Sequence, residues 1–548
     1  MLLVAGCTVD VIDRTVSPFA YDPPINPQTF RVEVNANSTV KGVEFNSPGA
    51  GIAPMANVGD NLYQTTTPVP DCAGAVEFSV NVTTQGVFSD NVDTFPEAGG
   101  FTHQVTGLPA ECADFAENFA QTFVVDRFED FPDSHPGDGV CQGIFSGPGL
   151  GCSLRAAIME ANAKPGVDLI RVPSGRYLLT RIGNEGEQDA NHSIRDLDVT
   201  ESVTIEGTSG ANSDLSDFLQ RTNDPMTDLT DNGNQFGFAR VDGNGAHRVF
   251  HVTGAGIVLR LRRLAILNGH QDGRGGGIYN LGTLVLERVA LSGNRAASVS
   301  GGAFGGGGIQ NDGTLIAGDV AFVQNLVEGD NPSGGALYNT GAVTMRRGLI
   351  AYNDARFGAA IRSVGGTMTL ENTTVFNNRW TAFGSTPPVS VLATQQDGET
   401  RLTFVTLSSH TLGDRDLLTA TPDSTVRVKN TLFVKNIADL CAGPVLSDGG
   451  NVVEGECGFD PASTPLAPDF EDVGIVAGTG LLVDEGGFTP VVIHAPPSSG
   501  SSLFSAVDRG FAPPFPFNDQ RGPPFERRVD GDGNGSVRAD SGAFEFTP

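Results

Sequence analysis

A repeated spacing of apolar residues organises the chain between residues 259 and 436. In each copy, apolar side chains occupy the first, third, sixth and eighth positions, and Asn usually occupies the eleventh. Successive copies begin 25 to 31 residues apart, with room for two copies between 368 and 426. Clear copies begin at Leu284, Leu315, Val343, Met368 and Val426, and weaker ones begin at Leu259 and Leu402.

This spacing predicts pairs of short strands joined by a bend. The first and third side chains lie on one face of a strand, and the sixth and eighth lie on one face of the next. In one straight strand the apolar residues would occupy every second position throughout. Here the interval between the two pairs is three positions, so the chain must turn there. A turn that recurs in every copy winds the chain into a solenoid whose coils stack at about 4.8 Å. The fold class we expect is therefore all-β, a right-handed parallel β-helix.

The Asn that ends each copy is expected to have a structural role. At a corner of the coil, Asn can adopt a left-handed backbone conformation and stack its side-chain amide on the Asn of the next coil. The predicted ladder consists of Asn294, Asn325, Asn353, Asn378 and Asn436.

Glycine-rich motifs lie between the copies, as in Gly275–Asn280 and Gly334–Asn339. Each is expected to supply a third strand with one inward aliphatic side chain, because glycine permits tight turns and close backbone stacking. A phosphate-binding loop is the competing interpretation. It fits less well, because no helical pattern and no Lys-Ser or Lys-Thr pair follows the glycines.

The chain before the repeats has a different pattern. Short alternating runs, Phe30–Val34 and Val76–Val82, predict a small antiparallel sandwich of immunoglobulin type. This domain could be a spacer or a binding module. A single segment, Cys152–Lys164, has a helical pattern. The expected organisation is a truncated lipoprotein signal (1–7), a proline-containing linker (8–24), the β-sandwich (25–112), a connector and cap with the first coils (113–200), the parallel β-helix (201–460), and a C-terminal coil with a closing tail (461–548).

Composition narrows the range of partners. The 548 residues include 71 Gly and 64 acidic against 34 basic residues, for a formal charge of −30. Nucleic-acid binding is excluded, because phosphates demand a basic surface. Electrostatic attachment to anionic lipid is disfavoured for the same reason. The acidic surface could simply be solvated, or some Asp-rich loops could bind a hard cation such as Ca²⁺.

The cysteines favour an oxidising compartment. Six of the seven fall into three pairs, and Cys7 is left over. The expected disulfides are Cys72–Cys112, Cys141–Cys152 and Cys441–Cys457. The segment Leu3–Cys7 resembles the lipobox of bacterial lipoproteins, which implies lipidation of Cys7 and a membrane anchor. A free thiol in the N-terminal tail is the alternative. Thr8 resembles the residue found in lipoproteins that are sent to the outer membrane.

A resemblance to a known family begins in the helical segment. The run Cys152–Ile158, followed by Pro165–Asp168, Arg171–Thr180 and Ser202–Gly207, resembles the CSLREA domain of bacterial surface β-helix proteins. The chain departs from the family at Ala156, where Glu is usual. The resemblance implies a short helix that covers the open end of the first coils. Such a cover is physically reasonable, because an open solenoid end exposes a sheet edge.

Other motifs extend the resemblance. Gly334–Leu337, Phe322–Asn325 and Phe433–Asn436 are similar to repeats of polymorphic outer-membrane proteins, which act as adhesins, and the whole pattern resembles choice-of-anchor proteins of the pectin-lyase-like fold. The C-terminus resembles the tail that closes such β-helices. It departs from the usual Cys-Asp-Ile pattern at Ala539 and Ser541.

Pectin-lyase-like folds include polysaccharide lyases and hydrolases, and catalytic groups on such a fold would stand at outward positions. A lyase needs a base such as Arg with Ca²⁺, and a glycosidase needs two nearby carboxylates. The fourth and fifth positions carry mixed charges, as in Glu287–Arg288 and Arg346–Arg347. These predict a stabilising ladder of charges rather than a catalytic cluster. No catalytic residue is therefore predicted.

A calcium loop is the strongest chemical candidate. Alternate oxygen ligands around a Gly turn stand at Asp530, Asp532 and Asn534, with Asp540 beyond. The twelfth position is Ser541 rather than Glu, so a true EF-hand is excluded. A simple Ca²⁺ loop or a flexible Asp/Gly turn fits the segment. Apart from Ca²⁺, no cofactor is expected.

Together these features predict an extracellular protein, anchored by lipid to the outer membrane of a Gram-negative bacterium. It is expected to bind polysaccharide or another cell-surface ligand as an adhesin or scaffold, because the long faces of a solenoid suit extended ligands. The alternative is a polysaccharide lyase or glycoside hydrolase. The same fold hosts both outcomes, so the fold alone does not decide between them.

Overall fold

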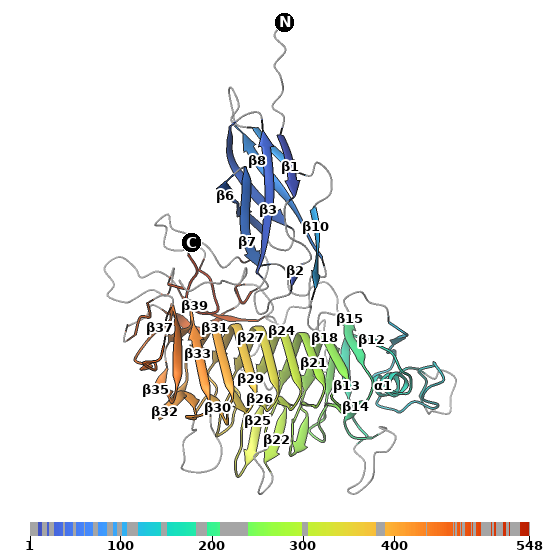
Figure 1. Ribbon diagram of the computed structural model, residues 1–548. Coiled ribbons are helices and arrows are strands. Elements are labelled where there is room, and N and C mark those ends of the chain that lie inside the picture. Colours follow the sequence, from blue (N-terminus) through green and yellow to red (C-terminus); the bar gives the residue numbers. More distant parts are fainter. Residues whose placement is uncertain are drawn as a thin grey trace. The chain divides into compact units, whose positions relative to one another are not determined.

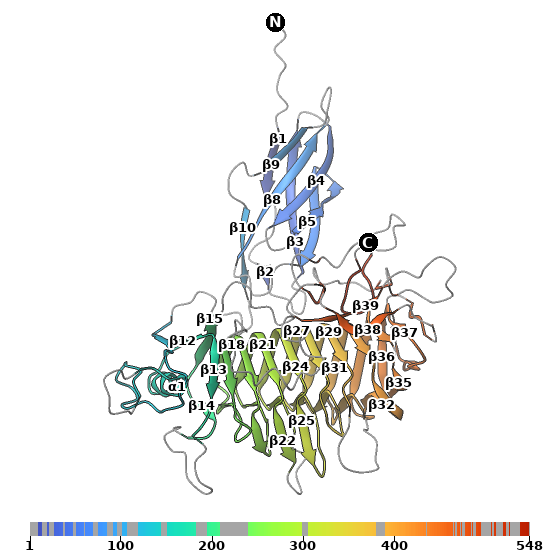
Figure 2. The ribbon, with the colours of Figure 1, turned by 180° about the vertical axis from the view of Figure 1, so that it is seen from behind.

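A computed structural model gives the architecture of the chain (Figures 1 and 2). Two compact units are present: Met1–Asn118 with Pro514–Phe517, and Phe119–Pro513 with Asn518–Pro548. The structure describes residues 119–143, 151–181, 194–208, 239–298, 305–379, 390–434 and 436–463, together with strands before 119 and short segments after 463.

The first unit contains two facing β-sheets. One sheet has the order β1 (Val9–Asp13), β3 (Pro27–Ala36), β7 (Leu62–Pro68) and β6 (Ala56–Gly59). The other contains β2 (Phe19–Ala20), β10 (Phe101–Thr106), β8 (Ala75–Thr84), β4 (Val40–Ser47) and β5 (Gly51–Pro54), with β9 (Asn91–Phe95) also paired to β8. All pairs are antiparallel except β2 with β10.

Side chains alternate between the two faces of each strand, and the inward ones pack between the two sheets. Phe30 of β3 and Phe45 of β4 are fully buried, and their ring centres lie 4.5 Å apart across the two sheets. The small antiparallel unit expected from the alternating runs is therefore present. The predicted linker over residues 8–24 is wrong in one part, because Val9–Asp13 pairs with β3 and belongs to this unit.

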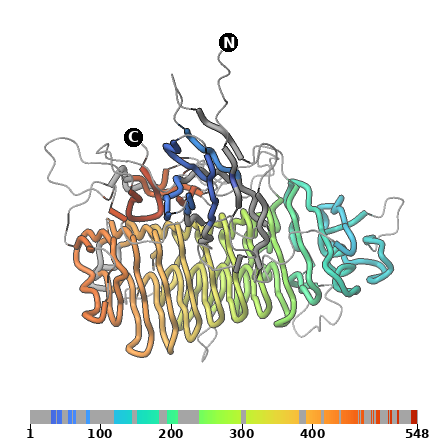
Figure 3. The backbone as a smooth tube through the Cα atoms, turned by 45° about the horizontal axis from the view of Figure 1, so that its top comes forward, coloured from blue at the N-terminus to red at the C-terminus, as the bar shows by residue number. Residues whose placement is uncertain are grey.

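The second unit is a parallel β-solenoid, and Figure 3 shows its coils stacked along one axis. Its fifteen-stranded sheet follows the order β11 (Thr122–Val124), β12 (Asp168–Pro173), β15 (Val203–Thr208), β18 (Val258–Leu267), β21 (Thr283–Ser292), β24 (Thr314–Val323), β27 (Ala342–Ala351), β29 (Thr367–Phe376), β31 (Glu399–Ser408), β33 (Thr425–Lys429) and β36 (Val445–Gly449), with β13 (Gly175–Leu178), β16 (Ala239–Asp242), β34 (Leu432–Val434) and β37 (Val452–Val453) beside this path.

Two further parallel sheets complete the coils. The nine-stranded sheet has the order β14 (Leu197–Val199), β17 (Phe250–Val252), β20 (Ile278–Asn280), β23 (Ile309–Asn311), β26 (Leu337–Asn339), β28 (Ile361–Val364), β30 (Leu392–Gln395), β32 (Thr411–Ala420) and β35 (Ile437–Ala442). The three-stranded sheet consists of β19 (His270–Asp272), β22 (Arg295–Ser298) and β25 (Leu326–Gly329).

The apolar spacing seen in the sequence is confirmed as the inward face of the fifteen-stranded sheet. Leu284, Leu286, Val289 and Leu291 of β21 all belong to the central core. The bend between the two pairs is concentrated at the fifth position, where Arg288 has a positive φ of 54°. The equivalent residues of other coils share this backbone: Arg263, Asp319, Arg347, Asn372, Phe404 and Asn430.

One start position is corrected. Leu402 pairs with Leu370, the third position of its copy, so this copy begins at Thr400 rather than at Leu402. Thr400 points inward and its hydroxyl bonds that of Thr394 at 2.7 Å. A polar residue at an apolar position hid the true start of the copy.

The Asn ladder is present and fully buried (Asn294, Asn325, Asn353 and Asn378). The side-chain amides of the first three donate to the side-chain oxygen of the next Asn at 2.9 Å. The left-handed backbone does not fall on these Asn residues as expected. It falls on the residue before them, as at Gln324 and Tyr352.

His410 replaces Asn as a rung of the ladder. Its Nδ1 lies 3.0 Å from Oδ1 of Asn436, and its Nε2 lies 3.5 Å from Nδ2 of Asn378. A carboxamide oxygen only accepts and a carboxamide nitrogen only donates, so this arrangement fits a neutral imidazole protonated on Nδ1. Burial lowers the pKa of His410 to about 4.

Acid should therefore destabilise the solenoid through His410. The unfolded imidazole takes up a proton near pH 6.5 and the folded one near pH 4, so stability falls as the pH drops through this interval. The loss should reach about 3 kcal/mol, from the shift of the pKa at ~1.4 kcal/mol per unit. Urea unfolding across this pH range should show a shallower pH dependence for His410→Asn, which keeps a ladder side chain. His135→Asn, at an exposed position, is the control. An unchanged slope in His410→Asn would contradict the assignment.

A second ladder of buried amides follows the nine-stranded sheet and was not expected. Asn280 donates to Asn311 at 2.7 Å, Asn311 donates to Asn339 at 2.8 Å, and Asn339 donates to the hydroxyl of Ser363 at 3.0 Å. These side chains bind backbone carbonyls of the following strands as well. Two corners of each central coil are thus fixed by buried hydrogen bonds.

A single helix among the described residues, α1 (Leu154–Asn162), packs on the first coils. It lies within the predicted helical segment, and the side chain of Ser153 caps it by accepting from the backbone N–H of Ala156 at 3.0 Å. Leu154 and Ile158 join the same core cluster as the coils, so the helix covers their apolar end.

Two of the three predicted disulfides are confirmed. Cys141 is bonded to Cys152 immediately before α1, and Cys441 is bonded to Cys457 near the last coils. The third predicted pair, Cys72–Cys112, and the lipobox residue Cys7 lie outside the described residues.

Many of the side chains at the seventh and ninth positions of the coils, which point outward, are apolar. Among them Ala290, Val323, Leu349 and Phe376 form one buried cluster with Val492. Val492 lies in β39 (Val491–His494), which pairs antiparallel with β38 (Ala477–Val483).

The tail continues along the same face of the fifteen-stranded sheet. The hydroxyl of Thr374 donates to Gln520 at 2.5 Å, and the backbone N–H of Ala543 donates to the hydroxyl of Thr406 at 2.8 Å. The C-terminal segment therefore covers an apolar outer face of the solenoid.

Candidate functional site

A row of polar and aromatic side chains runs along the outside of the nine-stranded sheet. Its strands β14 to β28 are short, and their first and third residues point into the core, so one central residue of each points outward. These central residues are in register and stack about 4.8 Å apart from coil to coil. The row, called the outer row below, consists of Asp198, His251, Tyr279, Gln310, Tyr338 and Arg362.

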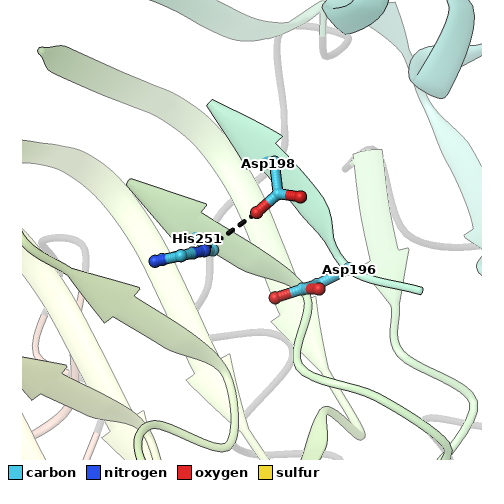
Figure 4. A group of neighbouring side chains, drawn as sticks. All are labelled: Asp196, Asp198 and His251. Carbon is cyan, nitrogen blue, oxygen red and sulfur yellow. Dashed lines mark hydrogen bonds and ion pairs between the residues drawn. The ribbon is translucent and has the colours of Figure 1, made fainter. Parts of the chain in front are cut away.

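An imidazole and two carboxylates meet at the first end of the outer row (Figure 4). Nδ1 of His251 lies 2.8 Å from Oδ1 of Asp198, and Asp196 lies beside them. Since a carboxylate accepts only, Nδ1 carries the proton that joins the two groups. Nε2 of His251 points away from both carboxylates, is buried and has no hydrogen-bond partner.

This cluster is the one group of three potential metal ligands that the described residues contain. Its ligand atoms lie within 4.8 Å of one another. All three residues are engaged, because Arg248 donates to Asp196 at 2.8 Å and His251 is bonded to Asp198. In this arrangement the chemistry of the cluster is that of a hydrogen-bonded acid–base group.

The middle of the outer row combines an aromatic ring with a paired charge. The ring of Tyr279 stacks on that of His251, with centres 5.2 Å apart and planes 5° apart. Arg274 donates to the hydroxyl of Tyr279 and to Asp312, both at 2.7 Å, and the Tyr279 hydroxyl donates to Asp312 at 3.0 Å. Burial raises the pKa of Tyr279, which keeps this phenol a hydrogen-bond donor.

Aromatic rings and arginines form the other end. The Arg362 guanidinium carbon lies 5.9 Å from the ring centre of Tyr338 and 5.3 Å from that of Phe357. Arg356 lies over the same Phe357 ring at 5.0 Å. Gln310 and Tyr338 are buried, whereas Arg356, Phe357 and Arg362 are partly exposed.

The structure does not test the predicted calcium ligands. Asp530, Asp532 and Asn534 lie outside the described residues. Asp540 is fully buried, and its carboxylate accepts the backbone N–H of Phe546 at 2.7 Å. The calcium hypothesis stays a prediction.

The predicted charge ladder is present on the fifteen-stranded sheet. Arg347 binds both carboxylate oxygens of Asp319, at 2.8 and 3.1 Å, and Arg262 pairs with Glu287 at 3.1 Å. These pairs link successive coils.

Sequence reasoning missed the outer row, although a signal for part of it existed. The repeated Gly-rich motifs end in Ile-Tyr-Asn, Ile-Gln-Asn and Leu-Tyr-Asn. The residue between the inward aliphatic and the inward Asn must point outward, so Tyr279, Gln310 and Tyr338 could have been aligned.

Searches against family models, curated proteins and solved structures find no match for this chain. The class of protein is therefore defined by its own fold and site: a parallel β-solenoid that carries one continuous polar and aromatic row on an outer face. In the part of the chain that the structure describes, no helix has the length and apolarity needed to cross a membrane.

Proposed function

We propose that the solenoid binds an extended polysaccharide, or a similar cell-surface ligand, along the outer row without altering it. The observation that carries this proposal is the register of the row, which repeats hydrogen-bonding and aromatic groups once per coil. A linear sugar polymer can place successive rings and hydroxyl groups against such a repeat. Aromatic faces provide apolar contact, and charged groups strengthen hydrogen bonds to the ligand.

The proposal includes a place on the cell surface. The resemblance of Leu3–Cys7 to a lipobox supports a lipid anchor at Cys7 in the outer membrane of a Gram-negative bacterium. The disulfides Cys141–Cys152 and Cys441–Cys457 support an oxidising compartment. The adhesin or scaffold role, the kinship with CSLREA-domain surface proteins and the Ca²⁺ loop at Asp530–Asp540 belong to the same proposal.

Replacing Tyr279 with Ala should weaken polysaccharide binding about tenfold, the equivalent of ~1.4 kcal/mol. The substitution removes the ring that stacks on His251 and the hydroxyl that joins Arg274 to Asp312. A glycan array screened with the full chain, in Ca²⁺ and in EDTA, identifies the ligand, and titration calorimetry measures the change.

Tyr352→Ala is the matched control. Tyr352 is also partly exposed, but it packs against Phe376 at the other sheet. Its loss should leave binding unchanged. Equal weakening by both variants, or no binding to any array glycan, would contradict a ligand site on the outer row.

A second candidate function arises from the His251–Asp198 pair. An imidazole whose Nδ1 is held by a carboxylate has a basic Nε2, and a general base is the group that a polysaccharide lyase or hydrolase would need. The array hits separate the two functions, because incubation with an enzyme shortens the polymer and incubation with a binding protein does not. Shortening that His251→Ala abolishes would favour catalysis.

A further inference from the structure

We infer that Arg362 and Arg356 form a subsite for an anionic group of the bound polymer, a carboxylate or a sulfate ester. The ligand is then an acidic polysaccharide. This inference rests on the proposed function, since it assigns the chemical class of the polymer that the outer row binds.

Arg362 is held by uncharged partners. Its Nη1 donates to the hydroxyl of Ser333 at 2.6 Å, and its Nη2 donates to the side-chain oxygen of Gln395 at 2.8 Å. Its Nε is buried and has no partner. Burial lowers the pKa of Arg362, and the phenol of Tyr338 is the group that opposes this shift. The guanidinium is thus fixed in place without a carboxylate to neutralise it.

Arg356 adds a second positive charge next to Arg362. Both guanidinium carbons lie within 5.3 Å of the Phe357 ring centre. The Nε of Arg356 is likewise buried without a partner, and Arg356 makes no ion pair with any residue that the structure describes. Each of these guanidinium groups provides N–H donors that suit a planar carboxylate or a sulfate.

The two arginines that contact Tyr279 of the outer row are neutralised, which makes the Arg362–Arg356 pair distinct. Arg248 is paired with Asp196 at 2.8 Å, and Arg274 is paired with Asp312 at 2.7 Å. A partly buried cation without a counter-charge is unfavourable, and an incoming anion would relieve that cost. The unpaired charges therefore mark where the ligand must bring its own negative charge.

The overall charge restricts this attraction to one place. A protein with a net charge of −30 repels polyanions in general, so an acidic polymer must be bound through a local positive site. A nucleic acid would need a long series of basic residues, because it carries a phosphate at every nucleotide. Two arginines beside tyrosines fit a polymer that combines sugar rings with spaced anionic groups.

The test compares three polymers of similar length on the full chain by titration calorimetry: a polyuronate, a sulfated glycan and a neutral glycan. The unaltered protein should bind one or both acidic polymers at least tenfold more tightly than the neutral one. Arg362→Gln and Arg356→Gln should each reduce acidic binding by about tenfold to a hundredfold, and leave neutral binding as it was. Arg347→Gln, which breaks a paired charge on the other sheet, should change neither.

A second measurement needs no glycan. Inorganic sulfate, compared with chloride at equal ionic strength, should raise the melting temperature of the unaltered protein more than that of Arg362→Gln. Without sulfate, Arg362→Gln should melt at the same temperature or higher, because it removes an uncompensated charge. A merely structural Arg362 would give a lower melting temperature.

The outcomes distinguish this inference from the proposed function. Equal affinity for neutral and acidic polymers, with no effect of either Arg variant, overturns the subsite and leaves the glycan-binding function in place. A sulfate effect that requires Arg362, without binding to any polymer, supports the anion subsite and overturns the glycan-binding function. Failure of both measurements overturns both.

Discussion

Replacing Asn325 with Ala should lower the free energy of unfolding of the surrounding coils by about 3–5 kcal/mol. The side chain accepts from the backbone N–H of Asn294 at 3.1 Å and from its amide at 2.9 Å. It also donates to the carbonyl of Leu291 at 3.0 Å and to Asn353 at 2.9 Å. These groups are buried, so the substitution leaves them without partners and without water.

Hydrogen exchange measured on peptides around residues 284–353 should detect this loss, because solenoid coils open locally. Asn331→Ala, at an exposed position, is the matched control and should change stability by less than about 0.5 kcal/mol. Similar protection in the two variants would mean that the ladder amides do not hold the coils together.

Replacing Arg155 with Met should lower the free energy of unfolding at the start of the solenoid by about 3–5 kcal/mol. Arg155 and Asp130 form an ion pair at 2.6 Å whose side chains are 1% and 2% exposed. Asp130 also accepts the backbone N–H groups of Thr180 and Arg181 at 2.7 and 2.9 Å. Met fills a similar volume but leaves the carboxylate of Asp130 buried without a counter-charge.

Urea unfolding of the single and double variants isolates the charge. Arg155→Met with Asp130→Asn should recover part of the loss, because it removes both charges together. Arg401→Met is the control, since Arg401 and Glu399 are 56% and 41% exposed and their pair should contribute less than about 1 kcal/mol. A loss for Arg155→Met no larger than for Arg401→Met would contradict this role of the pair.

The fold could be predicted because each coil repeats one short pattern of apolar residues. The inward spacing of Leu284, Leu286, Val289 and Leu291 depends on neighbours within the same coil, so it is visible in one copy. The wrong start position at Leu402 also has a cause within a single coil. Thr400 is inward yet polar, because Thr394 satisfies its hydroxyl, and the pattern of apolar residues does not include it.

The outer row was harder to predict because its members depend on register between distant segments. Asp198 and His251 are hydrogen-bonded although 53 positions separate them. The sequence shows no clear repeat around either residue, so their alignment follows only from the pairing of β14 with β17. The arginine pair could not be predicted either. Arg362 is distinctive because its hydrogen-bond partners, Ser333 and Gln395, are uncharged, and these partners are known only from the structure.

The C-terminal cover has a consequence for how the protein is made. Thr374 of a central coil is bonded to Gln520, which is 146 positions later in the chain. A ribosome therefore completes the coils well before it delivers the residues that shield their outer apolar face. Until then Leu349 and Phe376, which Val492 helps to bury, remain exposed and prone to aggregation. Nascent chains need protection from one another until the residues that form this cover, such as Gln520 and Ala543, have been synthesised.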